Sequence, residues 1–184
     1  VVMDRGYALP PGVPTVRFDN PQTNAFLAGG AAPAPNAAQR QTPRPAMNMQ
    51  RMLGMFPELL VKEIIPMIDA SFRTKPTREN RAMAGLSMGG FETKLITLRR
   101  PEVFNYYGLL SGGTYAPDDI KDKKQVESIF ISCGSKENPD GVTKAVNDLK
   151  AAGFKATSFV SPDTAHEFLT WRRSLYHMAQ LLFK

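Results

Sequence analysis

The stretch RAMAGLSMGGFETKL, residues 81–95, contains the pattern that decides the fold. A short apolar run ends at Leu86, Ser87 follows between glycines, and a helical pattern begins directly afterwards. This order predicts a short buried strand that turns sharply into a helix, with Ser87 at the turn. Gly85 and Gly89, two residues before and two after the serine, leave room for a strained backbone bend. Such a bend exposes the hydroxyl as a nucleophile, whereas in a plain turn the glycines would have no chemical meaning.

Short apolar segments alternate with amphipathic segments along the rest of the chain. The predicted strands are 81–86, 106–112, 128–134 and 155–160, and the predicted helices are 56–72, 88–100, 139–152 and 168–182. This alternation indicates an α/β fold, a mostly parallel sheet flanked by helices. At 184 residues the chain is predicted to be a single domain, residues 1–184.

Apolar positions at helical spacing predict which helix faces are buried. They are Phe91, Leu95 and Leu98 in the first helix after Ser87, Val142, Val146 and Leu149 in the next, and Trp171, Leu175, Met178 and Leu182 in the last. In the helix of residues 56–72, Pro57 suits the first turn and Pro66 is expected to produce a kink.

The first fifty residues differ in composition from the rest. VVMD at residues 1–4 predicts a short buried strand, and residues from about 10 to 49 are rich in Pro and Ala. Eight of the fifteen prolines lie in this second segment, which excludes a helix or a central strand. Because the segment leaves the carboxyl end of the first strand, we expect it on the active-site side. It either shapes the substrate site or is a disordered excursion.

Charge and composition exclude several classes of function. The net charge of +6 comes from scattered Lys and Arg without interleaved aromatic residues, which favours a solvated basic surface over a nucleic-acid site. No apolar run approaches the roughly 18 residues that span a bilayer. Cys133 is the only cysteine and is expected to be a small buried hydrophobe. No spacing of Cys and His indicates a metal, and no cofactor motif is present.

A serine nucleophile needs a base, and the chain contains two histidines. His177 lies on the polar face of the last predicted helix, which favours an exposed, structural role. His166 follows the last predicted strand in the loop SPDTAHEF. Loops at the carboxyl ends of parallel strands are where such folds carry chemistry. The sequence therefore predicts His166 as the base.

The acid of a triad is expected between Ser87 and His166 in the sequence, since folds with this elbow order the triad as serine, acid, histidine. The loop CGSKENPDG, residues 133–141, offers Glu137 and Asp140. Glu137 lies in the strand-end loop before the expected helix cap Asn138 and is preferred. Asp140 remains the alternative, although a carboxylate in a first helical turn also has a purely structural explanation. The backbone N–H of Met88, at the start of the helix, is the expected oxyanion donor.

Two segments carry a family resemblance, AMAGLSMGGFETKLITLRRPEVFNYYGLLSGG at 82–113 and DTAHEFLTWRRSLYHMAQLLFK at 163–184. Together they resemble the esterase D-like branch of the α/β hydrolases, above all the feruloyl and acetyl-xylan esterases of carbohydrate esterase family 1. The resemblance covers about residues 50–184. In the family's acid motif, G-x-E-D, the aspartate falls where this chain has Glu137.

The resemblance implies a serine esterase that acts on feruloyl or acetyl esters of plant polysaccharide, secreted or periplasmic. A small-acyl esterase of the S-formylglutathione hydrolase type is the alternative enzyme, and a non-catalytic carbohydrate-binding module of the same fold is the alternative from another class. Tyr115, after a strand end, and Tyr7 are candidate substrate-binding residues, although Tyr115 could equally be an ordinary surface tyrosine. No nucleic acid or membrane partner is expected, and the sequence does not define the oligomeric state.

The resemblance also implies a strand, and a second oxyanion donor, that nothing in this sequence supplies. The family places that strand between residues 1–4 and the strand that ends at Leu86. A buried strand needs partners for its N–H and C=O groups. We therefore expect residues 1–184 to be the C-terminal two-thirds of a catalytic domain, poorly soluble or nearly inactive without an upstream segment.

Overall fold

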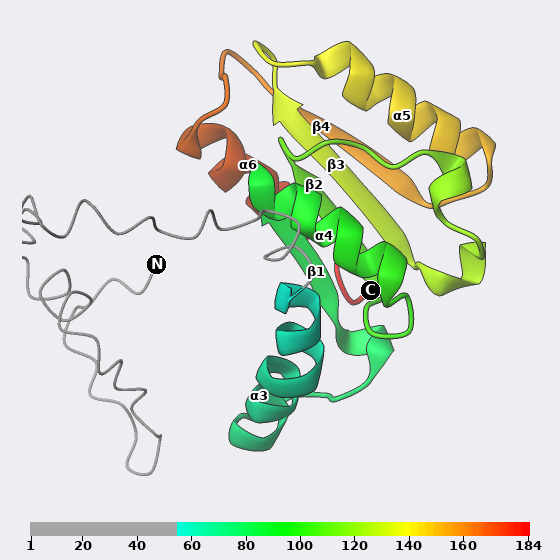
Figure 1. The fold of residues 1–184 in the computed structure, drawn as a ribbon. Coiled ribbons are helices and arrows are strands. Elements are labelled where there is room, and N and C mark those ends of the chain that lie inside the picture. The colour runs from blue at the N-terminus through cyan, green and yellow to red at the C-terminus, as the bar shows by residue number, and fades with distance from the viewer. Residues whose placement is uncertain (1–54) are drawn as a thin grey trace, which may run out of the picture. The chain divides into compact units, whose positions relative to one another are not determined.

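The computed structural model describes residues 55–184, and these form one sheet with helices on both of its faces (Figure 1). The predicted strand at 1–4, the segment 10–49 and Tyr7 lie outside the described residues. Four parallel strands follow the order β1-β2-β3-β4. Their bounds are Ala82–Leu86 for β1, Tyr106–Leu110 for β2, Ser128–Gly134 for β3 and Ala156–Ser161 for β4. The α/β prediction is confirmed.

Strand β1 differs from its prediction in one respect. The sequence predicts a buried strand, and all five residues of β2 are buried, yet none of the five residues of β1 is. Among the described residues, β1 is hydrogen-bonded to β2 alone and therefore forms an edge of the sheet. The apolar composition of β1 thus exceeds what its surroundings in the described structure require.

The helix predicted at 56–72 occupies residues 55–71, and its winding changes just before Pro66. Proline lacks an N–H group and clashes with the carbonyl four residues earlier, so regular α-helical bonding cannot continue through it. The turn before it, Leu60–Ile64, is accordingly π-helical, and the α-helix α3 continues over Ile65–Ser71. Phe56, Leu60, Val61 and Ile65 pack against the main hydrophobic cluster.

The remaining helices divide between the two faces of the sheet (Figure 1). Helices α4 (Met88–Arg99) and α5 (Pro139–Ala151) enclose the larger hydrophobic cluster, which includes Leu109, Ile129 and Ile131. Helix α6 (Phe168–Ala179) covers the opposite face with a smaller cluster built on Phe130 and Met178. Short 3-10 turns, η4 (Pro117–Asp119) and η5 (Lys123–Gln125), occupy the charged excursion between β2 and β3.

The predicted face of α5 is confirmed, because Val142, Val146 and Leu149 are its buried residues. The predicted face of α4 is partly wrong. Leu98 packs against the larger cluster, but Phe91 is half exposed, and the fully buried positions are Gly90, Thr93, Ile96 and Thr97. Helix α4 lies so close to the sheet that small residues are needed along the contact. The Thr93 and Thr97 hydroxyls donate to the carbonyls four residues earlier, which satisfies them inside the core.

The predicted face of α6 is partly wrong for a related reason. Met178 is buried and Trp171 packs against the smaller cluster, but Leu175 is 56% exposed. Thr170 and Ser174 are fully buried in its place, and both hydroxyls are hydrogen-bonded. Hydrophobic periodicity does not register hydroxyl residues that bond to their own helix or loop, so it misses such faces.

Candidate active site

Ser87 lies at the junction between β1 and α4 with φ 52° and ψ −121°, a left-handed conformation that is strained for a residue with a side chain. The predicted elbow is therefore confirmed. A Cβ atom added to Gly85 would lie 2.0 Å from the carbonyl oxygen of Gly89, so this position admits only glycine.

The prediction assigned the second spacing role to the wrong glycine. A Cβ atom on Gly89 would meet nothing within 4 Å, whereas one on Gly90 would lie 2.6 Å from the Cα of Gly112. The close approach that fixes the start of α4 is thus between Gly90 and the segment after β2.

His166 joins Ser87 to Glu137. Its Nε2 atom lies 2.8 Å from the Ser87 hydroxyl oxygen, and its Nδ1 atom lies 2.7 Å from Oε1 of Glu137. A carboxylate only accepts hydrogen bonds, so Nδ1 carries the proton and Nε2 of the neutral ring accepts from the Ser87 hydroxyl. The three predicted residues therefore form one continuous hydrogen-bonded chain.

The Glu137 carboxylate is held at both oxygens. Oε1 accepts from His166, while Oε2 accepts from the Gly134 N–H at 2.6 Å and from the Ser111 hydroxyl at 2.8 Å. Burial alone would raise the pKa of Glu137, but these three hydrogen bonds, and the charge of His166 when its ring is protonated, lower it overall. Asp140, the alternative acid, is exposed in the first turn of α5 and makes no hydrogen bond to His166 within the described part of the chain.

The strand ends bring these side chains together. Ser87 follows β1, Glu137 lies in the loop after β3, and His166 lies in the loop after β4. Backbone bonds continue the ladder one step past the strands. The Ser87 N–H donates to Leu110 at 2.9 Å, that of Ser111 to Ser132 at 2.8 Å, and that of Ser135 to Ser161 at 2.9 Å. The register of the sheet therefore sets the distances between Ser87, His166 and Glu137.

The loop that carries His166 is fixed by two buried threonines. The Thr170 hydroxyl of α6 shares its single proton between the Ala165 carbonyl at 2.6 Å and the Thr164 hydroxyl oxygen at 2.7 Å, and Thr164 donates to the Ser161 carbonyl. The ring of Trp171 meets the His166 ring edge-on, with 5.1 Å between centroids. Half of the His166 side chain remains exposed, which leaves Ser87 open to a bound molecule.

Sequence reasoning missed Ser111, Thr164 and Thr170 because none of them belongs to a motif. The signal for Ser111 was its place directly after a strand end, in LLSGG. His177 is exposed, as predicted, and its ring stacks on Phe159 with 4.0 Å between centroids. Cys133 is 3% exposed, as predicted, and burial raises the pKa of its thiol, as does the nearby Glu137 charge.

Tyr115 does not fit its predicted role in substrate binding. Its side chain is 1% exposed, and its hydroxyl pairs with that of Thr97 at 2.7 Å inside the core. Burial raises the pKa of the Tyr115 phenol strongly. The segment after β2 folds back over α4, which turns this ring inward and makes it a packing residue.

Four large apolar residues lie close to Ser87 or His166 in the sequence, and their side chains are exposed. Leu86 and Met88 flank the serine, Phe91 lies on the first turn of α4, and Phe168 follows His166 by two residues. Their exposed fractions are 43%, 58%, 51% and 71%. Met88 is the first residue of α4, where the backbone N–H has no acceptor within the helix.

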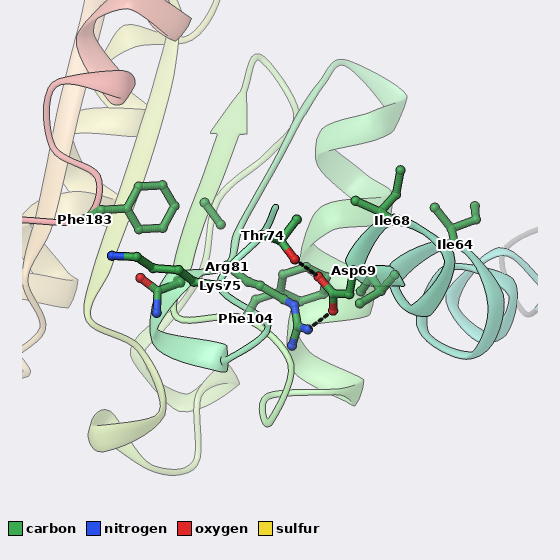
Figure 2. A pocket seen from close by; sticks show the side chains of 11 residues that line it. Ile64, Ile68, Asp69, Thr74, Lys75, Arg81, Phe104 and Phe183 are labelled. Atoms are coloured by element: carbon green, nitrogen blue, oxygen red, sulfur yellow. Dashed lines mark hydrogen bonds and ion pairs between the residues drawn. The ribbon is translucent and has the colours of Figure 1, made fainter. Parts of the chain in front are cut away.

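A hollow lies elsewhere among residues 55–184, at the amino ends of β1 and β2 (Figure 2). It has a volume of about 470 Å³ and is lined by Ile64 and Ile68 of the first helix, by Arg81, and by Phe104 and Phe183. Its carboxylate, Asp69, is already paired with Arg81 and accepts from Thr74 at 2.7 Å. Ser87, Glu137 and His166 do not line this hollow.

Neither a metal site nor a membrane span is found in the described residues. No group of three or more His, Cys, Asp or Glu side chains in 55–184 is arranged to hold a metal ion. Within the same residues, none of the helices has the length and apolarity to cross a bilayer.

Comparison with known proteins identifies the family. Residues 29–181 match the family described as "Putative esterase". An endo-1,4-beta-xylanase/feruloyl esterase from Xylanibacter ruminicola is 67% identical over 129 residues, which cover 70% of this chain and 18% of that protein. The chain thus spans about a fifth of the length of this curated relative. The chain belongs to the esterase family, a class of carboxylic ester hydrolases with the α/β-hydrolase fold.

Solved structures agree on the fold. A CE1 ferulic acid esterase from Anaeromyces mucronatus, in complex with ferulic acid, matches with a TM-score of 0.62 at 20% identity, covering 88% of this chain and 70% of that chain. The feruloyl esterase module from Clostridium thermocellum, complexed with sinapinate, gives 0.58 at 18% identity, with coverage of 70% and 58%. The resemblance stated from the two sequence segments is thereby confirmed.

Proposed function

We propose that this chain hydrolyses feruloyl or acetyl esters on plant cell-wall xylan through an acyl-enzyme on Ser87. The observation that carries the proposal is the hydrogen-bonded chain from Ser87 through His166 to Glu137. The name of the Xylanibacter ruminicola relative supports the feruloyl ester as substrate.

In the proposed reaction, His166 acts first as a base and then as an acid. Nε2 takes the hydroxyl proton of Ser87 while Oγ attacks the ester carbonyl carbon. When the tetrahedral intermediate collapses, the same proton passes to the leaving sugar oxygen, and the acyl group stays on Ser87. In the second half of the reaction, His166 takes a proton from a water molecule that attacks the acyl-enzyme. The proton then passes to Oγ of Ser87, and the carboxylic acid is released. Glu137 keeps the proton on Nδ1 and stabilises the imidazolium that forms in each step.

The oxyanion needs donors aimed at the developing charge. The Met88 N–H is suited to this role because it starts α4, where it has no helical acceptor and where the helix dipole favours negative charge. We assign one donor to Met88 and leave the second donor to residues outside those described.

The exposed side chains of Leu86, Met88, Phe91 and Phe168 favour an aromatic acyl group over an acetyl group. An apolar ring gains from burial against such surfaces at about 25 cal/mol per Å² of apolar area, whereas a methyl group offers little area. A feruloyl ester is therefore the preferred substrate, and an acetyl ester is the second.

The proposal is tested with methyl ferulate, acetylated xylan and S-formylglutathione as parallel substrates. We expect hydrolysis of methyl ferulate with the highest kcat/KM, and we expect Ser87→Ala to abolish both hydrolysis and labelling by a fluorophosphonate. His177→Gln is the control, because this exposed histidine makes no contact with Ser87 in the described structure. Undiminished labelling of Ser87→Ala would refute the nucleophile, and preference for S-formylglutathione would refute the substrate class.

We also propose that the protein acts outside the cytoplasm, secreted or periplasmic. A cell-wall polysaccharide is too large to enter a cell, so an enzyme that acts on its esters has to meet it outside. Cell fractionation followed by immunoblotting tests this, and recovery of the protein in the cytoplasmic fraction alone would contradict it.

A further inference from the structure

Each of the four strands is followed by a polar side chain that belongs to one hydrogen-bonded network. Ser87 and Ser111 directly follow β1 and β2, and Glu137 and His166 lie in the loops after β3 and β4. The first three have roles in the proposed reaction, whereas Ser111 has none. Its hydroxyl nevertheless lies 2.8 Å from Oε2 of Glu137.

The backbone of Ser111 is strained in a way that this contact explains. Its φ angle is 50°, one of four positive values at non-glycine residues among those described. The left-handed region favours glycine, and two glycines, Gly112 and Gly113, follow directly. A serine at this position keeps a hydroxyl that glycine would lack, and strained residues of this kind gather at functional sites.

Backbone hydrogen bonds fix Ser111 and the residue before it, so the Ser111 hydroxyl has a defined position. Its N–H donates to the Ser132 carbonyl of β3 at 2.8 Å, and the preceding carbonyl, that of Leu110, accepts from the Ser87 N–H at 2.9 Å. The residue is therefore tied on one side to the strand of the acid and on the other to the nucleophile.

Because the acid is a glutamate, its carboxylate needs donors that fix its orientation, and the Ser111 hydroxyl is one of them. A glutamate has one more rotatable bond than an aspartate, and Glu137 approaches His166 from a short loop. The Gly134 N–H and the Ser111 hydroxyl both donate to Oε2, which leaves Oε1 as the oxygen that accepts from Nδ1. Two donors on one oxygen define the rotation of the carboxylate, which a single donor would leave free.

We propose that Ser111 is a positioning residue that orients the Glu137 carboxylate, and through it the His166 ring, for proton transfer to and from Ser87. This inference rests on the proposed function, because it concerns the efficiency of the same site. The hydroxyl does not touch the reacting atoms and acts only through Glu137.

The test compares Ser111→Ala, which removes the hydroxyl and keeps the strain, with Ser111→Gly, which removes both. We expect each to lower kcat by roughly ten-fold or more, the size expected when one hydrogen bond to a charged group is lost, with KM nearly unchanged. Ser111→Gly should be at least as heat-stable as Ser111→Ala, and its Tm, compared with that of the unmodified protein, separates a loss of activity from a loss of fold. Ser135→Ala is the matched control, since its hydroxyl accepts from the Asp163 N–H and not from the triad.

Two further measurements isolate the route through Glu137. In a Glu137→Ala background, Ser111→Ala should cause no additional loss, because the group it orients is gone. The low-field proton NMR signal of Nδ1–H of His166 should shift or broaden in both Ser111 variants and stay unchanged in Ser135→Ala. A kcat within two-fold of the unmodified protein, a full additional loss in the Glu137→Ala background, or an unchanged Nδ1 signal would overturn the inference. The NMR result decides even if the protein hydrolyses none of the tested esters, the outcome that would instead refute the proposed function.

Discussion

At the scale of single residues, the most informative position is Glu137, where the resemblance leads to an aspartate. The longer side chain reaches His166 because the loop after β3 folds back on itself, with the Gly134 N–H donating to Oε2 at 2.6 Å. Three donors surround the carboxylate, and only one of them is His166. The carboxylate is thus satisfied by one local donor and two that come from other strand ends.

Glu137→Gln tests the assignment of the acid. An amide places an N–H group or a poorer acceptor against Nδ1 and favours the wrong tautomer of the imidazole. We expect kcat to fall by up to about 10⁴-fold, as in serine proteases when the triad aspartate becomes asparagine. Asp140→Asn removes the same charge three residues further along, in the first turn of α5, and is expected to change kcat little. Steady-state kinetics on the same ester measure both, and a larger effect of Asp140→Asn would exchange the two assignments.

The residues with chemical motifs were predictable, and those that support them were not. Ser87, His166 and Glu137 follow from the elbow, from the choice between two histidines and from the order of the triad. Ser111 acts through a hydroxyl whose partner, Glu137, lies far away in the sequence, and Thr170 acts through a hydroxyl that bonds to the preceding loop, which no motif marks. Tyr115 was misplaced because an exposed and a buried tyrosine after a strand end look alike until the packing of the following segment is known.

At the scale of secondary structure, a close contact joins α4 to the segment after β2. It depends on Gly90 and Gly112, whose Cα atoms leave no space for another carbon. This contact keeps α4 against the sheet, and Ser87 is the residue immediately before α4.

A matched pair of alanine substitutions on α4 tests this packing. Gly90→Ala would place a carbon 2.6 Å from the Cα of Gly112. We expect it to lower the free energy of unfolding by about 1–3 kcal/mol, as overpacked substitutions do. Gly89→Ala adds the same carbon in open space and should leave stability unchanged or raise it by at most ~1 kcal/mol through helix propensity. Urea unfolding followed by circular dichroism compares the two. Equal effects would show that the contact does not limit the approach of the helix.

Strand and helix positions were largely predictable, whereas the faces of two helices were not. Short apolar runs and the prolines at 101 and 139 define the elements, and α5 shows a clean apolar stripe. On α4 and α6, close approach selects Gly, Thr and Ser for the buried face. Their hydroxyls bond to nearby carbonyls, so a hydrophobic pattern cannot reveal them.

At the scale of the whole described structure, carboxylates tie separate elements together. The hydrogen bond from Thr74 is the main cause that lowers the pKa of Asp69. Burial acts in the opposite direction, and the hydrogen bond and charge of Arg81 lower the pKa further. Burial alone would raise the pKa of Asp119, but the hydrogen bonds from Lys94 and from the Ala116 N–H and the charge of Lys94 lower it overall. The pKa of Glu137 is lowered as well.

These lowered pKa values predict how stability depends on pH. A carboxyl group whose pKa is lower in the folded state binds fewer protons folded than unfolded. Its stabilising effect is complete above the unfolded pKa, about 4, and is lost as the pH falls through the folded value. We therefore expect the midpoint of urea unfolding to be nearly constant between about pH 5 and 7 with respect to these groups and to fall steeply below about pH 4.

Asp119→Asn provides the corresponding variant. It removes the bond between η4 and Lys94 of α4, so it should lower the unfolding midpoint at pH 7 and flatten the decline below pH 4. Asp118→Asn is the control, because this exposed neighbour carries the same charge and forms no salt bridge in the described residues. An unaltered acid slope in Asp119→Asn would indicate that other carboxylates dominate acid unfolding.

The edge-on contact between Trp171 and His166 has a spectroscopic consequence. Trp171 is the only tryptophan of the chain, and the centre of its ring lies 5.1 Å from that of the histidine. Tryptophan emission from this protein therefore originates at one point, beside the imidazole that the proposed reaction protonates. In the proposed acyl-enzyme, a hydroxycinnamoyl group on Ser87 would quench that emission by accepting the excitation energy of Trp171. Trp171 would then report on acylation without a label, and stopped-flow fluorescence would follow the site during a single turnover.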